Sequence, residues 1–250
     1  MLEPFLAYLP LILAVFLLAG TVKGAIGLGL PTISVGLLGL VMPPMQAAAI
    51  LVVPSMVTNL WQLADGRSPL PMLRRLWPLL AGIVVGTLLV GWLLRDLQLP
   101  HASQWLGVAL LVYAALGLAA VPLRVAPQQE AWLAPLVGAV TGAITAVTGV
   151  FVIPAVPYLQ AIGLEKDELV RGLGLSFSVS TLALALSLGH QGELLQPAVL
   201  AVSALALLPA LLGMAGGQWL RRRVSAERFR RWFFIGLLLL GADLALRGLF

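Results

Sequence analysis

Long apolar segments recur from one end of this 250-residue chain to the other, and they constrain its fold more than any other feature. They cover residues 5–22, 46–63, 76–94, 102–121, 131–162, 172–189, 194–219 and 232–246. A helix of about 20 apolar residues crosses the ~30 Å hydrocarbon core of a bilayer. Strands of a membrane barrel would instead alternate polar and apolar residues over about 10 positions. The sequence therefore predicts an all-α polytopic membrane protein.

The composition agrees with a bilayer environment. Hydrophobic residues make up 60% of the chain and charged residues 10%, whereas a soluble domain carries about 25% charged residues. The chain has no cysteine, which excludes disulfides, iron–sulfur centres and thiolate metal sites. The first ten residues contain Glu3 and no basic residue, so we expect no cleaved signal peptide and a first segment that stays in the membrane.

Two glycine-rich stretches of the sequence resemble each other. They are AGTVKGAIGLGLPTISVGLLGL (19–40) and VGAVTGAITAVTGVFVIPAV (137–156). In each half of the chain, a glycine-rich pair of short apolar segments is followed by three longer ones, which gives about five segments per half. We therefore predict two membrane repeats, residues 1–125 and 126–250, within one integral membrane domain.

The charges of the loops indicate that the two repeats are inverted. Loop 64–75 carries three arginines, and its counterpart 189–197 carries no Arg or Lys. Loop 95–101 carries one arginine, and its counterpart 220–231 carries six. Because Arg and Lys collect on the cytoplasmic side, equivalent loops face opposite sides, as in many secondary transporters. This rule explains the net charge of +5 without a nucleic-acid partner. We expect both termini outside and these loops inside: 64–75, 122–130, 163–170 and 220–228.

Both repeats are interrupted where they resemble each other. Proline follows the glycines in each half, at Pro31 and at Pro154, and the segments after them are short for full spans. Proline and glycine disfavour a continuous helix, and irregular backbone at membrane depth is tolerated only inside protein or along a cavity. We therefore read 20–32 and 138–150 as the tips of two broken-helix hairpins, and we predict that they meet near the membrane midplane.

These tips have the composition of an anion site. A broken helix presents unpaired N–H groups and the positive end of its dipole, and Lys23 adds a full positive charge beside them. Nearby threonines, serines and an asparagine offer further donors. The candidate substrate-binding residues are Lys23, Gly24, Gly27, Gly29, Thr32, Asn59, Thr141, Gly142, Thr145, Thr148, Gly149, Arg171 and Ser176.

Structural alternatives stand beside each of these assignments. Lys23 could end the first span and extend to the interface, although an intramembrane charge more often serves function. The glycines could be close-packing positions between helices, and Ser176 could bond across helices. Arg171 could anchor the start of a span at the interface.

The same residues argue against enzymatic activity and resident cofactors. The apolar segments contain no nucleophile–base pair, and His101 and His190 fall in loops without metal-ligand spacing. We therefore expect no catalytic residue, no metal site and no cofactor. The expected partners are the lipid bilayer and a small anionic substrate, with no nucleic acid. Whether the protein forms a homo-oligomer stays open.

The order and duplication of these motifs resemble the sulfite exporter TauE/SafE family of bacterial membrane proteins. The stretches that carry the resemblance are GTVKGAIGLGLPTIS, GAVTGAITAVTGVFVIPAVPYLQAIGLEKDELVRGLGLS and GMAGGQWLRRRVSAERFRRWFFIGLLLLGADLAL, and the likeness covers nearly the whole chain. It implies a multi-pass transporter or exporter of the bacterial inner membrane. The expected substrate is sulfite, an organosulfonate or a small organic acid, moved by alternating access. The alternatives are a passive anion channel and a non-transporting membrane scaffold.

Overall fold

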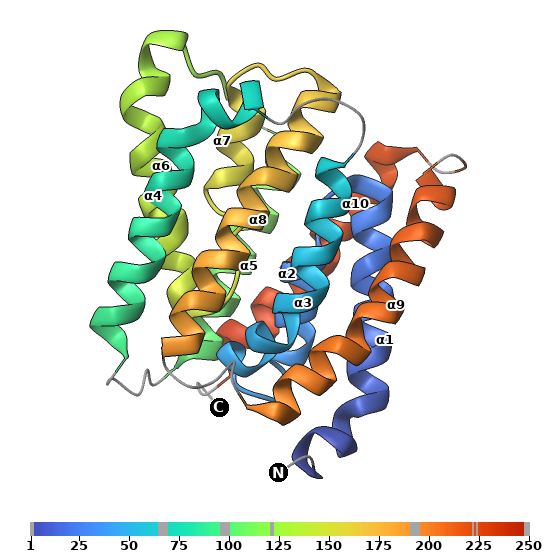
Figure 1. The fold of residues 1–250 in the computed structure, drawn as a ribbon. Coiled ribbons are helices and arrows are strands. Elements are labelled where there is room, and N and C mark those ends of the chain that lie inside the picture. The colour runs from blue at the N-terminus through green and yellow to red at the C-terminus, as the bar shows by residue number, and fades with distance from the viewer. Residues whose placement is uncertain are drawn as a thin grey trace.

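Helices form all the regular secondary structure in the described part of the chain. The computed structural model describes residues 3–64, 70–95, 101–120, 123–190, 196–221, 223 and 225–247, which contain ten α-helices and no strand (Figure 1). The first half holds α1 (Glu3–Ile26), α2 (Leu30–Leu38), α3 (Pro44–Leu63), α4 (Leu70–Leu94) and α5 (Ala102–Ala119). The second half holds α6 (Pro127–Thr148), α7 (Ala155–Ala161), α8 (Lys166–His190), α9 (Pro197–Arg221) and α10 (Ala226–Leu246).

This architecture confirms the predicted all-α membrane class. Six of the described helices are long and apolar enough to cross a bilayer, namely α1, α4, α5, α6, α8 and α9. The predicted boundary between the repeats falls between the end of α5 and the start of α6. The two ends of the described chain lie at the same end of the bundle (Figure 1).

The two predicted interruptions are present as short second helices. Between α1 and α2 the backbone takes a left-handed conformation at Gly27 (φ 77°) and Gly29 (φ 109°), which glycine adopts without strain. Between α6 and α7 the same conformation occurs at Gly149 (φ 72°). α2 has nine residues and α7 seven, so each pair, α1–α2 and α6–α7, forms a hairpin with one long and one short arm.

Glycines bring two pairs of helices into backbone contact. α1 packs along α9, where a Cβ added at Gly24 would lie 2.1 Å from the Met214 carbonyl oxygen. α4 packs along α6 in the same way, where a Cβ added at Gly138 would lie 2.1 Å from the Leu79 carbonyl oxygen. Small residues at such positions allow membrane helices to approach closely. Each of these pairs joins one helix of the first half to one helix of the second.

Contacts along the helices fix their directions. α1, α3 and α9 run one way, whereas α4, α6 and α8 run the other. α5 and α10 pack against each other in opposite directions. The helices α1, α3, α4 and α5 therefore run opposite to their counterparts α6, α8, α9 and α10. An inverted repeat requires these directions, while its placement in the membrane stays a prediction.

The prediction that the two hairpin tips meet is wrong. The carbonyl of Gly27 accepts a hydrogen bond from Gln62 near the end of α3 (3.2 Å), whereas a Cβ added at Gly149 would lie 2.5 Å from Cβ of Ala48 near its start. The 14 residues from Ala48 to Gln62 correspond to roughly 21 Å along the helix axis. The tips lie apart because the first contacts the end of α3 and the second contacts its start.

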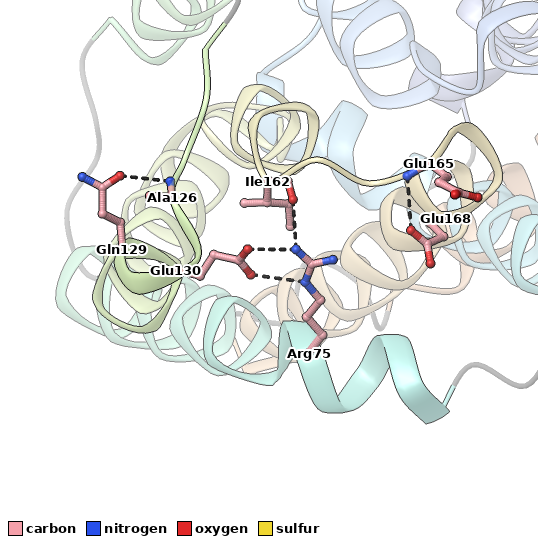
Figure 2. Close-up of polar contacts among 7 residues, drawn as sticks. All are labelled: Arg75, Ala126, Gln129, Glu130, Ile162, Glu165 and Glu168. Atoms are coloured by element: carbon pink, nitrogen blue, oxygen red, sulfur yellow. Dashed lines mark hydrogen bonds and ion pairs between the residues drawn. The ribbon is translucent and has the colours of Figure 1, made fainter.

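An ion pair joins three elements at the end of the bundle where α4 and α6 begin. The guanidinium of Arg75 donates two hydrogen bonds to the Glu130 carboxylate (2.8 and 3.2 Å) and one to the carbonyl of Ile162 (2.9 Å), as Figure 2 shows. These bonds connect α4 and α6 to the turn that follows α7.

Candidate functional site

Lys23 is buried inside the bundle, although it lies near the end of α1. Its side chain crosses to α3, where its Nζ donates hydrogen bonds to Oγ1 of Thr58 (3.0 Å) and to Oδ1 of Asn59. The residue is 2% exposed. Among the described residues, no acidic side chain forms an ion pair with it. Within the described part of the chain, the ammonium therefore has neutral partners and no countercharge.

A chain of hydroxyl and amide groups holds Asn59 in place. Its Nδ2 donates to Oγ of Ser55 (3.1 Å) and to Oγ1 of Thr181 (3.4 Å), and these two hydroxyls lie 2.9 Å from each other. The Thr58 hydroxyl donates to the carbonyl of Pro54 (2.7 Å), which leaves its oxygen free to accept from Lys23. The network links α1, α3 and α8, so the position of the ammonium depends on three helices.

A cavity of about 850 Å³ reaches Lys23 from one end of the bundle. Its mouth lies between the end of α3, the start of α8 and the end of α9. Gln62, Gln218 and Arg221 add polar groups to its wall, and Trp61 contributes an aromatic face. Met214 of α9 packs against Gly24 of α1. Arg221 lies seven residues after Met214 on α9, which places it about 10 Å nearer the mouth of the cavity. The cavity therefore has one positive charge at its mouth and another at its inner wall.

The first hairpin tip forms part of this wall. Gly24 and Gly27 line the cavity, and Gly27 is held by its bond from Gln62. Gly29 is turned away, since a Cβ there would meet the side chain of Val22 at 2.7 Å. The Thr32 hydroxyl donates to the Gly29 carbonyl (3.1 Å), so it closes the turn and is not among the residues that line the cavity.

The candidate residues of the second half lie outside this cavity. The hydroxyls of Thr141, Thr145 and Thr148 each donate to a carbonyl one turn earlier in α6, at 2.7 to 2.8 Å. Gly142 packs on α4, with a Cβ position 2.3 Å from the Ile83 carbonyl oxygen. Gly149 turns the backbone beside α3. The structure does not bring these residues together with Lys23.

Two further candidates, both on α8, are not among the residues that line the cavity. Ser176 is fully buried, and its hydroxyl has no hydrogen-bond partner among the described residues. Arg171 is half-buried, and its Nε donates to the carbonyl of Asp167 (3.3 Å). Neither lines the cavity.

Three residues with amide or charged side chains line the cavity but were not among the candidates from sequence: Gln62, Gln218 and Arg221. Gln62 lies three residues after Asn59, so the two amides share one face of α3, and this spacing was the available signal. Arg221 belongs to the basic stretch 220–231, whose arginines were attributed from the sequence to the positive-inside rule and were not assigned to a binding site. Within the described ranges, no three His, Asp or Glu side chains gather closely enough to hold a metal ion.

The fold and the site together define a multi-pass helical membrane protein with a charged cavity inside its bundle. A family model, sulfite exporter TauE/SafE, matches residues 12–244, which is nearly the whole chain. The chain therefore belongs to the sulfite exporter TauE/SafE family, as its motifs suggested. Members of this family are membrane transporters, and in bacteria such proteins lie in the inner membrane. No curated protein and no solved structure matches it significantly.

Proposed function

We propose that this protein is a secondary carrier of a small anion, and that the anion binds to Lys23 in the cavity. A sulfur oxyanion, an organosulfonate or a small carboxylate would suit the site. The family supports this proposal. The observation that carries it is the buried Lys23 ammonium, which lines the cavity and has no acidic partner among the described residues.

An uncompensated buried charge explains why an anion would bind there. Removing an ammonium from water is unfavourable unless a countercharge and hydrogen bonds replace the lost hydration. Thr58 and Asn59 replace part of the hydration and leave one of the three N–H donors for a ligand. An incoming anion would supply the missing countercharge. Arg221 at the mouth would raise the local concentration of anions.

The packing beyond Lys23 favours a carrier over a channel. On the far side of the ammonium, Ser55 and Thr181 join α3 to α8. Phe177, whose carbonyl accepts a hydrogen bond from Thr181, packs edge to face on Phe151, with ring centroids 5.4 Å apart. Among the described residues, those that line the cavity come from the ends of α1, α3 and α9 and the start of α8, so the cavity opens toward that end of the bundle. In the topology predicted from the loop charges, that end faces the cytoplasm, where an exporter would take up its substrate.

The test combines binding with flux. Purified wild type and Lys23→Met are compared with sulfite, ethanesulfonate, acetate and chloride, first by thermal shift and then by uptake into proteoliposomes. Lys23→Met keeps the length of the side chain and removes its charge. Arg74→Gln removes an exposed charge from α4 and serves as the matched control.

We expect at least one of the oxyanions to stabilise wild type and Arg74→Gln but not Lys23→Met, because a ligand that binds only the native state raises its apparent stability. The flux should saturate and should be accelerated by the same anion on the other side. Flux that never saturates would establish a channel instead. If no anion stabilises the protein and none is transported, the protein would be a non-transporting membrane scaffold.

A further inference from the structure

A second cavity lies between α5, α7 and α10, and it shares no lining residue with the cavity of Lys23. Its volume is about 280 Å³. Its polar lining consists of the Tyr113 phenol, the Gln160 amide and the Arg230 guanidinium. It lies where α5 ends and α10 begins, which is the cytoplasmic end in the topology predicted from loop charges.

Tyr113 gives the clearest sign that this cavity has a ligand. The residue is 2% exposed, and its hydroxyl has no hydrogen-bond partner among the described residues. Its ring packs edge to face on Phe234, with centroids 5.2 Å apart, which holds the phenol at the cavity wall. Buried hydroxyls in native proteins are nearly always paired, so an unpaired one that lines a cavity indicates a missing partner.

The other walls indicate what kind of ligand that is. Arg230 is exposed, and no ion pair is found for it in the described part of the chain. Leu116, on the apolar helix α5, is 42% exposed, and such an apolar side chain on the outside of a membrane bundle faces lipid. The cavity thus has a cationic edge, a neutral donor and a side continuous with the lipid-facing surface.

We propose that this cavity binds the phosphate headgroup of an anionic phospholipid. The phosphate lies at Arg230 and accepts a hydrogen bond from the Tyr113 hydroxyl, and the acyl chains leave the cavity on the lipid-facing side of α5, where Leu116 lies. The cytoplasmic leaflet carries anionic lipids, and basic pockets between helices on that side suit their headgroups. Arg228 and Arg231, in the same turn region of α10, add to the attraction.

The experiment uses the full-length protein in phosphatidylcholine nanodiscs or mixed micelles. Phosphatidylglycerol, additional phosphatidylcholine, inorganic phosphate or glycerol 3-phosphate is titrated, and Tm and native mass spectra are recorded. The variants are Arg230→Gln, Tyr113→Phe, which removes only the hydroxyl, and the control Arg231→Gln, whose side chain does not line the cavity. Lys23→Met separates this site from the transport site.

We expect phosphatidylglycerol to raise the Tm of wild type, Arg231→Gln and Lys23→Met. Binding should weaken about tenfold in Arg230→Gln, as expected for a lost charge-assisted hydrogen bond, and by a smaller factor in Tyr113→Phe. An equal response to inorganic phosphate would show a free-phosphate site and overturn the lipid assignment. Equal weakening by Arg230→Gln and Arg231→Gln would show diffuse surface attraction and overturn the cavity site. If phosphatidylglycerol does not raise the Tm of wild type, the cavity site is also overturned.

Discussion

The contact between α1 and α9 can be tested by adding a single methyl group. Gly216 and Gly217 are neighbours in α9, but only Gly217 faces α1. A Cβ at Gly217 would lie 2.0 Å from the carbonyl oxygen of Thr21, whereas one at Gly216 has no atom within 4 Å. Gly217→Ala should therefore force α1 and α9 apart, and Gly216→Ala should leave them in place.

The expected difference in stability follows from this geometry. Ordinary van der Waals contact begins at 3.4 Å, so the backbones must separate by roughly 1.4 Å (3.4 minus 2.0) to admit the methyl group of Gly217→Ala. Overpacking of this kind typically destabilises by about 1–3 kcal/mol. Alanine also raises helix propensity by up to about 1 kcal/mol, but this gain is common to both variants and cancels in their comparison.

The assay is thermal unfolding of wild type, Gly216→Ala and Gly217→Ala in the same detergent. For a chain of this length, about 2 kcal/mol corresponds to a difference in Tm of roughly 4–8 °C between the two variants. Gly216→Ala should match or slightly exceed wild type. Equal Tm values for the two variants would refute the close approach of α1 and α9, and with it the placement of Lys23 at the cavity wall.

Three further predictions concern the network, the ion pair and the driving force. Asn59→Leu removes an acceptor of the Lys23 ammonium at similar volume, so anion affinity in the thermal-shift assay should fall about tenfold or more. Unchanged affinity would show that the ammonium needs no support from α3. Arg75→Gln should lower the free energy of unfolding by about 1 kcal/mol, and this loss is small because the Arg75 side chain is 40% exposed. Glu130→Gln should give a similar loss, and urea or thermal unfolding measures both. An inside-negative potential should speed outward flux of a monovalent anion, since 100 mV supplies about 2.3 kcal/mol per charge. A flux whose rate does not change when a potential is imposed with valinomycin would indicate coupling to a counter-ion.

Much of the fold follows from the sequence, because the bilayer leaves few options. A long apolar segment can only be a helix there, so the long helices fall on the apolar runs. The interruptions were predicted because glycine and proline act locally: Gly27, Gly29 and Gly149 take left-handed backbone where the runs break. The meeting of the tips was not correctly predicted, since it depends on tertiary packing, which sets the two tips against opposite ends of α3.

The site was predicted only in part, because its contacts are distant in sequence. Lys23 was found as an intramembrane charge, but its partners lie 35 and 36 residues away, and no spacing rule states which face of α3 meets α1. The threonines of α6 have the composition of a polar site, yet Thr141 and Thr145 bond to their own helix. A hydroxyl that can donate to a carbonyl one turn earlier in its own helix gives little information about ligands.

The pairing of α1 with α9 also has a consequence for biosynthesis. Gly20 packs against Ala210, so the ribosome adds 190 residues (210 minus 20) between the two sides of this contact. At about 5–20 residues per second, the first helix waits roughly 10–40 s in the bilayer before its partner is made. During that time Lys23 lacks the wall formed by α9, and lipid or the insertion machinery must cover the exposed glycine face. Crosslinking of stalled nascent chains through residue 20 should therefore report lipid or translocon contacts before α9 emerges, and contacts with α9 only afterwards.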